Sequence, residues 1–336
     1  MNELTRRIEA VLSERTGGAV TVEDLASLPG GACQDNLRVD LVFSSGSFEG
    51  ERRMVLRSDA EASLPGSIDR RREFEVIGAA VEAGVRTPAA HFLSEGLVRP
   101  GASAYFLDWI DGEAIGAKVL RHPSLAAARE RLAVEVAEVL AAIHRITPKT
   151  KPSLPLPDRE SDPVQIALLF VRAVLDRLPE PRPGFEIAYR WLVENRPERR
   201  EITLVHGDFR TGNFMVSPGG LAGVLDWEFA HWGDPLDDLG WLCVRDWRFG
   251  VLDRPAGGFA KRADFHAAYS RASGREVDPA AVRFWEVLGN VRWGAAAVLQ
   301  GERYGKGRTG DIEMLAIPVR APEMEWEALR LIDRAT

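Results

Sequence analysis

The stretch from Leu204 to Trp241, LVHGDFRTGNFMVSPGGLAGVLDWEFAHWGDPLDDLGW, most constrains what this chain can fold into. A short apolar run ends at Asp208, and two further apolar runs flank the turn-forming residues 217–220, SPGG. Gly and Pro between apolar segments predict a β-hairpin. The same stretch holds five aspartates. Burying a carboxylate is costly unless it is paired. These carboxylates are therefore expected to bind a charged partner.

Three polar residues of this stretch are expected to divide metal binding and proton acceptance between them. Asp208 and Asn213 form the pattern D-x-x-x-x-N before the hairpin, and Asp226 follows its second strand. The outer ends of paired strands meet, so Asn213 and Asp226 are expected to converge. Mg²⁺ takes oxygen ligands from one or two protein groups and from substrate phosphates, which leaves Asp208 as a base for an attacking hydroxyl. Arg210 is expected to offset charge on the transferring phosphoryl group. Taken alone, D-x-x-x-x-N more often only caps a turn.

The runs HGDFRTGNFMV and GVLDWEFAHWGDPLDDLG resemble the aminoglycoside-phosphotransferase-like enzymes, small-molecule kinases that share the protein-kinase fold. The resemblance implies transfer of the γ-phosphate of ATP to a hydroxyl of a small molecule, with Mg²⁺ as cofactor. By it, Asp208 is the general base, Asn213 and Asp226 hold the metal, and His206 braces the loop. Asp238 is expected to be structural, capping or anchoring the helix that starts there.

The first third of the chain predicts a small antiparallel sheet with one packed helix. Residues up to Gly17 predict an amphipathic surface helix, and residues 67–85 predict a second helix. The segments with strand character are residues 19–28, 36–43, 52–57, 91–96 and 103–110. The second helix is expected to bury a stripe of Ile68, Phe74, Ile77 and Val81.

Beyond Asp111 the patterns become helical. Residues 125–146 predict a long core helix with Leu125, Ala128, Leu132, Val136, Val139 and Ile143 on one stripe. Residues 164–178 and 185–195 predict two helices that are expected to cap the site, and the chain after Pro235 is mostly helical. The predicted fold class is α+β and bilobal. An N-terminal nucleotide-binding lobe of residues 1–110 precedes a larger catalytic and acceptor-binding lobe of residues 111–336.

The resemblance requires a nucleotide site in the N-terminal lobe. Gly30 and Gly31, with Gln34 in the same loop, lie between two strands, where backbone amides could cover phosphates. A glycine pair in a hairpin is ordinarily only a turn. The segment YFLDWIDG resembles the hinge that binds adenine through the backbone, with Trp109 helping to wall the pocket.

Charged residues are also expected at this nucleotide site. Arg57 stands in VLR, where protein kinases place a lysine, and its guanidinium could clamp two phosphate oxygens as a fork. Glu73 is the expected ion-pair partner of Arg57, with Glu75 as the competing candidate. In the hinge, the backbone from Asp108 to Ile110 is expected to bond the adenine edge.

Composition argues against several other classes of function. With 43 Lys and Arg against 50 Asp and Glu, the net charge of −7 disfavours nucleic-acid binding. No apolar run is long enough to span a bilayer, so no membrane role is expected. Cys33 and Cys243 are too few for a disulfide framework, which favours a cytoplasmic protein. The oligomeric state and the choice between ATP and GTP do not follow from the sequence.

The acceptor is the least determined part of the prediction. Acidic residues near the C-terminus would suit a polycationic aminoglycoside, although a charge run is usually a solvated face; they are Asp311, Glu313, Glu323, Glu325 and Glu327. Four tryptophans would favour a less polar acceptor if two of them faced the site; they are Trp227, Trp232, Trp285 and Trp293. The segment FWEVLGNVRWG resembles the branch of the family associated with acyl-CoA dehydrogenases, which implies a hydroxylated acyl chain or another small alcohol.

Two other functions remain open. A nucleotide-binding regulatory module without transfer activity would use the same nucleotide lobe but would need no base. A metallohydrolase would use His206, Asp208 and Asp226 as ligands, and it would need further histidines near them.

Overall fold

The computed structural model describes residues 3–28, 35–59, 64–157, 161–198, 201–305 and 316–333. The chain divides into two compact units. Unit 1 comprises Met1–Asp111, Ser153–Pro155 and Gly223–Ala230, and unit 2 comprises Gly112–Pro152, Leu156–Ala222 and His231–Thr336. The segment that carries Asp226 therefore belongs to the same unit as the N-terminal residues.

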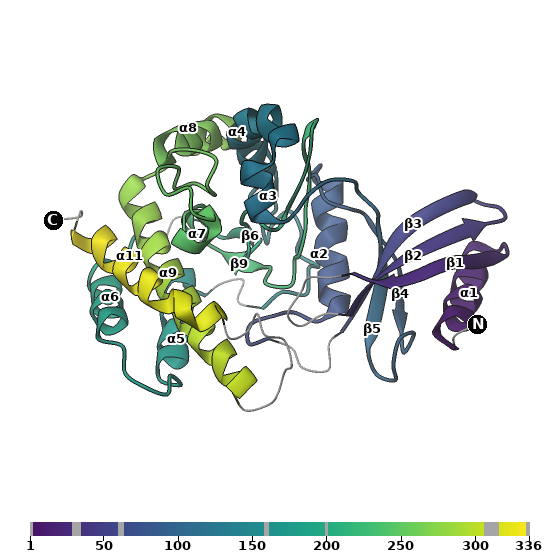
Figure 1. Ribbon diagram of the computed structural model, residues 1–336, viewed down its shortest axis with the longest axis horizontal. Helices are drawn as coiled ribbons and strands as arrows, with labels where there is room; N and C mark the ends of the chain where they lie inside the picture. Colours follow the sequence, from purple (N-terminus) through teal and green to yellow (C-terminus); the bar gives the residue numbers. More distant parts are fainter. Residues whose placement is uncertain are drawn as a thin grey trace. The chain divides into compact units, whose positions relative to one another are not determined.

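Unit 1 is built on a five-stranded antiparallel sheet in the order β1-β2-β3-β5-β4 (Figure 1). Its elements are α1 (Glu3–Thr16), β1 (Val20–Ser27), β2 (Asp35–Phe43), β3 (Gly50–Ser58), α2 (Arg70–Glu82), β4 (Ala90–Glu95) and β5 (Ser103–Asp108). Ile8 and Leu12 of α1 pack into the apolar core of the sheet with Leu41 and Phe106. The strands and both helices predicted from periodicity are confirmed.

Helix α2 packs against β4 and β5, and the predicted stripe is confirmed at Ile68 and Ile77, which are buried. Asp69 caps the helix by accepting a backbone N–H, and Gly84 follows its end with φ of 77°. The predicted stripe is wrong at Val81, which is exposed, whereas Arg70 and Glu73 are buried. Apolar periodicity missed Arg70 and Glu73 because these charged side chains are buried as an ion pair.

Unit 2 is mainly helical. Its helices are α3 (Gly116–Arg121), α4 (Ala126–Ile143), α5 (Pro163–Leu175), α6 (Pro183–Glu194), α7 (Leu236–Leu242), α8 (Arg262–Ser273), α9 (Pro279–Gly305) and α11 (Ala321–Asp333), with the 3₁₀ turns η1 (Pro123–Leu125), η2 (Arg245–Arg248) and η3 (Ile317–Arg320). All six residues of the predicted α4 stripe are buried. Helices α5 and α6 pack against α9, and α6 also packs against α11 (Figure 1).

Two short strand pairs frame the loop that contains Asp208. Strand β6 (Thr203–Val205) pairs antiparallel with β9 (His231–Gly233). Strands β7 (Phe214–Ser217) and β8 (Gly220–Val224) form the predicted hairpin. The sequence did not predict β9, because its three residues are too few to show alternation.

Close backbone packing fixes α7 against α9. A Cβ added at Gly240 would lie 2.5 Å from the Cβ of Trp285 and 2.7 Å from the backbone nitrogen of Glu286. Only a glycine allows this approach without displacing a helix. Helix α7 is thereby held where its first turn can reach the loop after β6.

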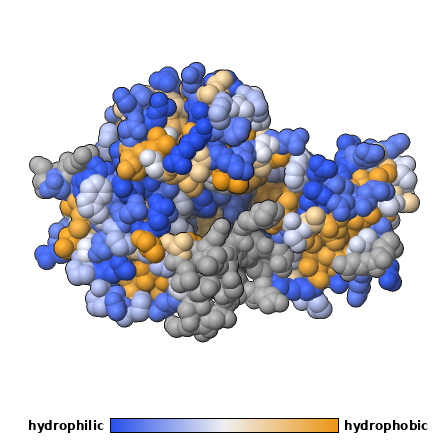
Figure 2. Space-filling view, viewed as in Figure 1, coloured by the Kyte–Doolittle hydropathy of each residue, from blue (hydrophilic) through white to orange (hydrophobic). Residues whose placement is uncertain are grey.

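No helix in the described part of the chain is long and apolar enough to cross a membrane. On the face drawn in Figure 2, hydrophilic residues predominate over the helices of unit 2.

The approach of α7 to α9 can be tested with a pair of glycine substitutions. Gly240→Ala is expected to lower the free energy of unfolding by about 1–3 kcal/mol, because the added methyl overpacks the helix contact. Gly78→Ala, within α2, is the control: its Cβ would meet nothing within 4 Å, and it is expected to stabilise by about 0.5–1 kcal/mol. Denaturant unfolding of both variants measures the difference, and equal effects would contradict the packing argument.

Candidate active site

Asp208 lies in unit 2, on the loop between β6 and β7, and its carboxylate is held by three donors. Trp241 Nε1 donates to Oδ1 at 2.8 Å, and Arg210 Nε donates to the same oxygen at 3.0 Å. Asn213 Nδ2 donates to Oδ2 at 2.6 Å. The carboxylate is almost buried, and these bonds fix it in one orientation.

Asp238 holds the backbone of this loop. Its carboxylate is fully buried and accepts the N–H of His206 at 2.8 Å and that of Gly207 at 3.0 Å. His144 Nε2 lies 3.2 Å from Oδ2. Burial alone would raise the pKa of Asp238, but His144, His206 and the backbone bond outweigh it and lower that pKa. Asp238 thus anchors the loop after β6, whereas Asp234 accepts the N–H of Leu236 at the start of α7.

Both histidines beside Asp238 are fully buried. Burial lowers the pKa of His144, against the effect of Asp238, which favours a neutral ring that donates to the carboxylate. The other ring nitrogen of His144 lies 2.7 Å from the hydroxyl of Tyr269. His206 Nδ1 accepts the N–H of Asp208 at 3.2 Å. These bonds place His206 where the resemblance expects a residue that braces the loop.

Arginine and tryptophan side chains surround the Asp208 carboxylate. The guanidinium of Arg210 lies over Trp247, 4.4 Å from the ring centroid, and Arg292 lies over Trp241 at 3.9 Å. Trp241 and Trp247 are themselves in contact, with ring centroids 5.4 Å apart. Sequence reasoning missed Trp241, although it stands three residues after Asp238 on α7, a spacing that puts both on one helix face.

Asn213 offers one atom to a metal. Its Nδ2 donates to both the carboxylate and the backbone carbonyl of Asp208, the latter at 2.9 Å. Its own N–H closes the turn by donating to the carbonyl of Arg210 at 3.0 Å. The amide oxygen is then the group with which Asn213 could bind Mg²⁺.

In unit 1, Arg57 is buried and forms an ion pair with Glu73. Nη2 lies 2.9 Å from Oε1, and Nε donates to Oε2 at 3.1 Å. Glu75 is exposed on α2, so Glu73 is the partner. Arg57 also pairs with Asp226. Burial would lower the pKa of Arg57, but Glu73 and Asp226 raise it well above its usual value.

The segment Gly223–Ala230 is fixed within unit 1 around Asp226. Asp226 adopts φ of 69°, a left-handed conformation that is uncommon for a residue other than glycine. The following Trp227 is buried, and its Nε1 donates to Thr87 Oγ1 at 3.0 Å. The carbonyl of Glu228 accepts the N–H of Ile68 at 2.7 Å. Before Asp226, the N–H of Val224 donates to the carbonyl of Arg86 at 2.8 Å, so this backbone is fixed on both sides of Asp226.

Negative charge exceeds positive charge around Asp226. Arg57 and Arg70 face three carboxylates, because Arg70 pairs with Glu73 and with Glu228 at 3.2 Å. Burial, followed by the charge of Asp226, raises the pKa of Glu228 to about 7. An excess of carboxylates in oxygen-rich surroundings fits a divalent cation such as Mg²⁺. Arg70 and Glu228 were not assigned from the sequence, although the Arg-x-x-Glu spacing on α2 was readable.

The remaining predicted nucleotide contacts are placed as follows. Gly30, Gly31 and Gln34 lie outside the described residues. At the end of β5, the N–H of Asp108 donates to Ala89, and that of Trp109 donates to the carbonyl of Arg53. The guanidinium of Arg53 lies over Trp109 at 5.5 Å. These two amides are therefore engaged within unit 1.

The tryptophans do not indicate an apolar acceptor. Trp227, Trp232 and Trp285 are at most 2% exposed, so they belong to the core. Trp293 donates its N–H to Asp246 at 2.7 Å. Across the described residues, no group of three or more His, Cys, Asp or Glu could hold a metal ion. Magnesium bound by one Asn, one Asp and phosphates needs no such cluster.

The model of the phosphotransferase enzyme family (APH) matches residues 28–285. Acyl-CoA dehydrogenase family member 10 of Mus musculus is 29% identical over 203 residues, which cover 58% of this chain and 18% of that protein. Member 11 of Homo sapiens is 28% identical over 205 residues, covering 57% of this chain and 25% of that protein. The chain thus spans about a fifth to a quarter of the length of these relatives.

Solved structures share the fold. One described as a candidate aminoglycoside phosphotransferase from Ralstonia eutropha JMP134 has a TM-score of 0.73 at 23% identity, covering 98% of both chains. The aminoglycoside phosphotransferase APH(4)-Ia, in a ternary complex with AMP-PNP and hygromycin B, has a TM-score of 0.62 at 17% identity, covering 96% of this chain and 98% of that one. A choline/ethanolamine kinase family protein from Mesorhizobium loti has a TM-score of 0.60 at 18% identity, covering 98% and 95%.

The chain belongs to the phosphotransferase enzyme family. The predicted α+β class, with an antiparallel sheet in one unit and helices in the other, is confirmed, and it is the protein-kinase-like fold of the aminoglycoside phosphotransferase structures.

The anchoring role of Asp238 predicts a loss of stability in Asp238→Asn. The carboxamide leaves at least one of three buried donors without an acceptor, which costs about 1–3 kcal/mol. Because the folded pKa of Asp238 is lowered, its ionic stabilisation is present above about pH 4 and is lost as pH falls through the folded value. The difference from wild type should therefore shrink in acid. Denaturant unfolding at several pH values measures it, and the exposed Asp264→Asn on α8 is the control.

Proposed function

We propose that this phosphotransferase moves the γ-phosphate of ATP to a hydroxyl of a small molecule, with Asp208 as the base. The observation that supports this most is the orientation of the Asp208 carboxylate by Trp241, Arg210 and Asn213. Such an arrangement serves a reaction that removes a proton at one position. A module that only binds nucleotide has no use for it.

In the proposed reaction, Asp208 accepts the proton of the acceptor hydroxyl as its oxygen attacks the γ-phosphorus. The bond from that phosphorus to the bridging oxygen breaks, and ADP leaves. An incoming hydroxyl needs a lone pair that Arg210 now occupies. Arg210 is a quarter exposed, so it is the donor that can move, and in moving it can turn to the phosphoryl group. Trp241 is buried and keeps the carboxylate oriented.

The nucleotide is proposed to bind through unit 1. Arg57, held by Glu73, would clamp phosphate oxygens, with the loop of Gly30, Gly31 and Gln34 over them. The backbone from Asp108 to Ile110 is the proposed adenine contact, with the N–H of Ile110 as donor because those of Asp108 and Trp109 are engaged within unit 1. Mg²⁺, for which Asn213 and Asp226 are the proposed ligands, would neutralise phosphate charge when bound. The carboxylate excess around Asp226 supports this assignment.

The similar proteins differ in the nucleotides and acceptors with which they are associated. APH(4)-Ia was solved with AMP-PNP and hygromycin B, and a 2′-phosphotransferase was solved with GDP. Other relatives are a choline/ethanolamine kinase family protein and two members of the acyl-CoA dehydrogenase family. Aminoglycosides, amino alcohols, sugars and hydroxyacyl compounds are therefore the acceptor classes to be screened with ATP and GTP.

The base assignment predicts that Asp208→Ala abolishes acceptor-stimulated release of ADP. A general base contributes about 10²–10⁴-fold, so turnover with the best acceptor is expected to fall by at least that factor in the presence of Mg²⁺. Nucleotide binding by the variant, measured by calorimetry, shows that it is folded. Full acceptor-stimulated turnover in Asp208→Ala would refute the assignment, and tight nucleotide binding without turnover on any acceptor would favour a regulatory module.

Trp241→Phe removes one donor to the base while keeping a ring in place. We expect kcat to fall by about tenfold, the equivalent of one hydrogen bond to a charged group, with little change in the acceptor KM. Trp232→Phe is the matched control, since among the described residues the buried Trp232 Nε1 has no acceptor. Equal kcat values for both variants would show that Trp241 acts only through packing.

A further inference from the structure

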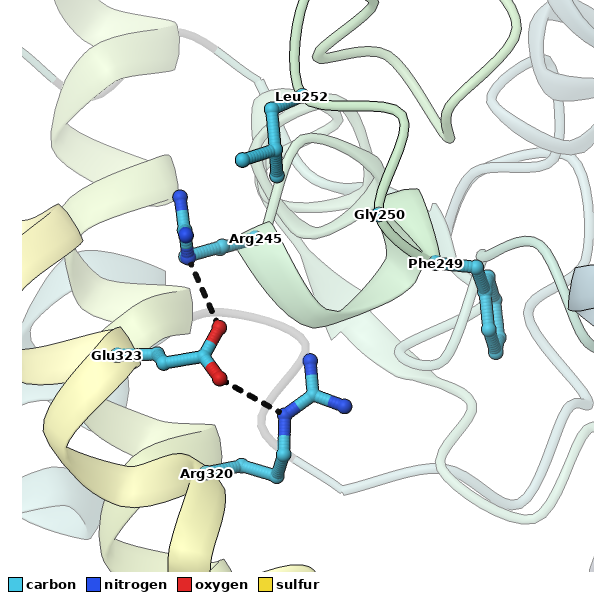
Figure 3. Close-up of a pocket in the computed structure, with 6 residues that line it drawn as sticks. All are labelled: Arg245, Phe249, Gly250, Leu252, Arg320 and Glu323. Atoms are coloured by element: carbon cyan, nitrogen blue, oxygen red, sulfur yellow. Dashed lines mark hydrogen bonds and ion pairs between the residues drawn. The ribbon is translucent and has the colours of Figure 1, made fainter.

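A pocket of about 370 Å³ opens in unit 2 beside η2 (Figure 3). Its lining comes from segments far apart in the sequence; it consists of Arg245, Phe249, Gly250, Leu252, Arg320 and Glu323. Arg245 begins η2, Arg320 ends η3, and Glu323 lies in the first turn of α11. Figure 3 shows the carboxylate of Glu323 between the two arginine side chains.

The pocket contains two guanidinium groups that share one accessible carboxylate. Glu323 lies 3.2 Å from Arg245 Nε and 3.6 Å from Arg320 Nε. Its side chain is 46% exposed, so it sits at the rim and is free to rotate into solvent. The guanidinium of Arg245 is more deeply placed, at 17% exposure of its side chain. A ligand anion could therefore replace Glu323 without any movement of the backbone.

Positive charge is in excess below this rim. Among the described residues, the ion pairs of the pocket continue from this exposed rim into a partly buried network of five arginines and four carboxylates; they are Arg245, Arg248, Arg262, Arg320 and Arg330 with Asp246, Glu286, Glu323 and Glu327. Burial would raise the pKa of Glu327, but Arg330 and Arg248 lower it to about 2. When Glu323 turns away, Arg245 keeps Glu327 at 3.7 Å and Arg320 keeps Asp246, and the five arginines of the network then face three carboxylates.

The pocket adjoins the loop of the proposed base through η2. Trp247, within η2, contacts both Arg210 and Trp241. The ring of Phe249 would lie 3.8 Å from a Cβ added at Gly212, in the same loop as Asp208. The turn η2 thus supplies both a pocket residue, Arg245, and a contact to the loop of Asp208, Trp247.

We propose that this pocket binds an anionic group, a carboxylate or a phosphate, that the acceptor carries at some distance from its reacting hydroxyl. Arg245 and Arg320 are the recognising groups, because guanidinium binds planar or tetrahedral oxyanions through paired donors. Glu323 is an internal counter-ion that the acceptor displaces. The inference rests on the proposed function, and it makes a hydroxy acid or a phosphorylated alcohol a better acceptor than a polycation.

Turnover of matched acceptors tests the subsite. Each pair consists of a hydroxy acid and its amide, or of a phosphorylated diol and the diol. Wild type should prefer the anionic member. Arg320→Gln, at an exposed position, is expected to raise KM for that member by about tenfold to hundredfold and to leave kcat and the neutral member unchanged. Glu323→Gln should lower the same KM. Arg190→Gln, on the exposed face of α6, controls for net charge.

Inorganic phosphate gives a test that does not depend on turnover. Added to the nucleotide-free protein, it should raise Tm most in Glu323→Gln, less in wild type and least in Arg320→Gln, since the shift follows affinity. Equal shifts in the three proteins, or equal KM for both members of each acceptor pair, would overturn the subsite. Phosphate that inhibits neutral and anionic acceptors alike would indicate a site for free anion, and this too would overturn it. Absence of turnover on every acceptor, with the ordered Tm shifts retained, would instead refute the proposed phosphotransfer.

Discussion

The buried carboxylate of Asp238 is the interaction on which the candidate active site depends. A fully buried ion is tolerable only when its oxygens are saturated, and here two backbone amides and a neutral histidine saturate them. Both amides belong to the loop that leads to Asp208. The hydrogen bonds that stabilise the buried carboxylate therefore also fix the conformation of this loop. The Gly240 contact, which brings α7 against α9, sets the position from which Asp238 makes these bonds.

In unit 1, buried charged side chains are likewise stabilised by neighbours of opposite charge. Arg57, Glu73 and Arg70 are all nearly inaccessible to solvent, and each touches at least one partner of opposite sign. Removing one member would leave another buried charge unpaired, which is more costly than the pair is favourable. Such a cluster holds a precise geometry only while complete. A metal ion would enter this arrangement where carboxylates outnumber arginines, beside Asp226.

The sequence predicted elements with a repeating pattern and missed those defined by long-range contacts. The α4 stripe from Leu125 to Ile143 was readable, because a continuous core helix buries one face at a fixed period. The α2 stripe was misread at Val81, since hydropathy cannot anticipate that charged side chains will be buried as pairs. Asp208 and Asn213 stood in a recognisable pattern. Trp241 did not, because its bond to Asp208 joins residues on different elements, and its spacing from Asp238 indicates only a shared helix face.

The indole rings around Asp208 allow changes at the site to be followed by tryptophan fluorescence. Trp241 donates directly to the carboxylate, and Trp247 lies beneath the guanidinium of Arg210. Trp247 also contacts Trp293, with ring centroids 4.8 Å apart. The emission energy of an indole depends on the charges close to its rings. Departure of Arg210 from Asp208 would therefore change the intrinsic fluorescence of the protein, so that loading of the acceptor could be followed in real time without any label.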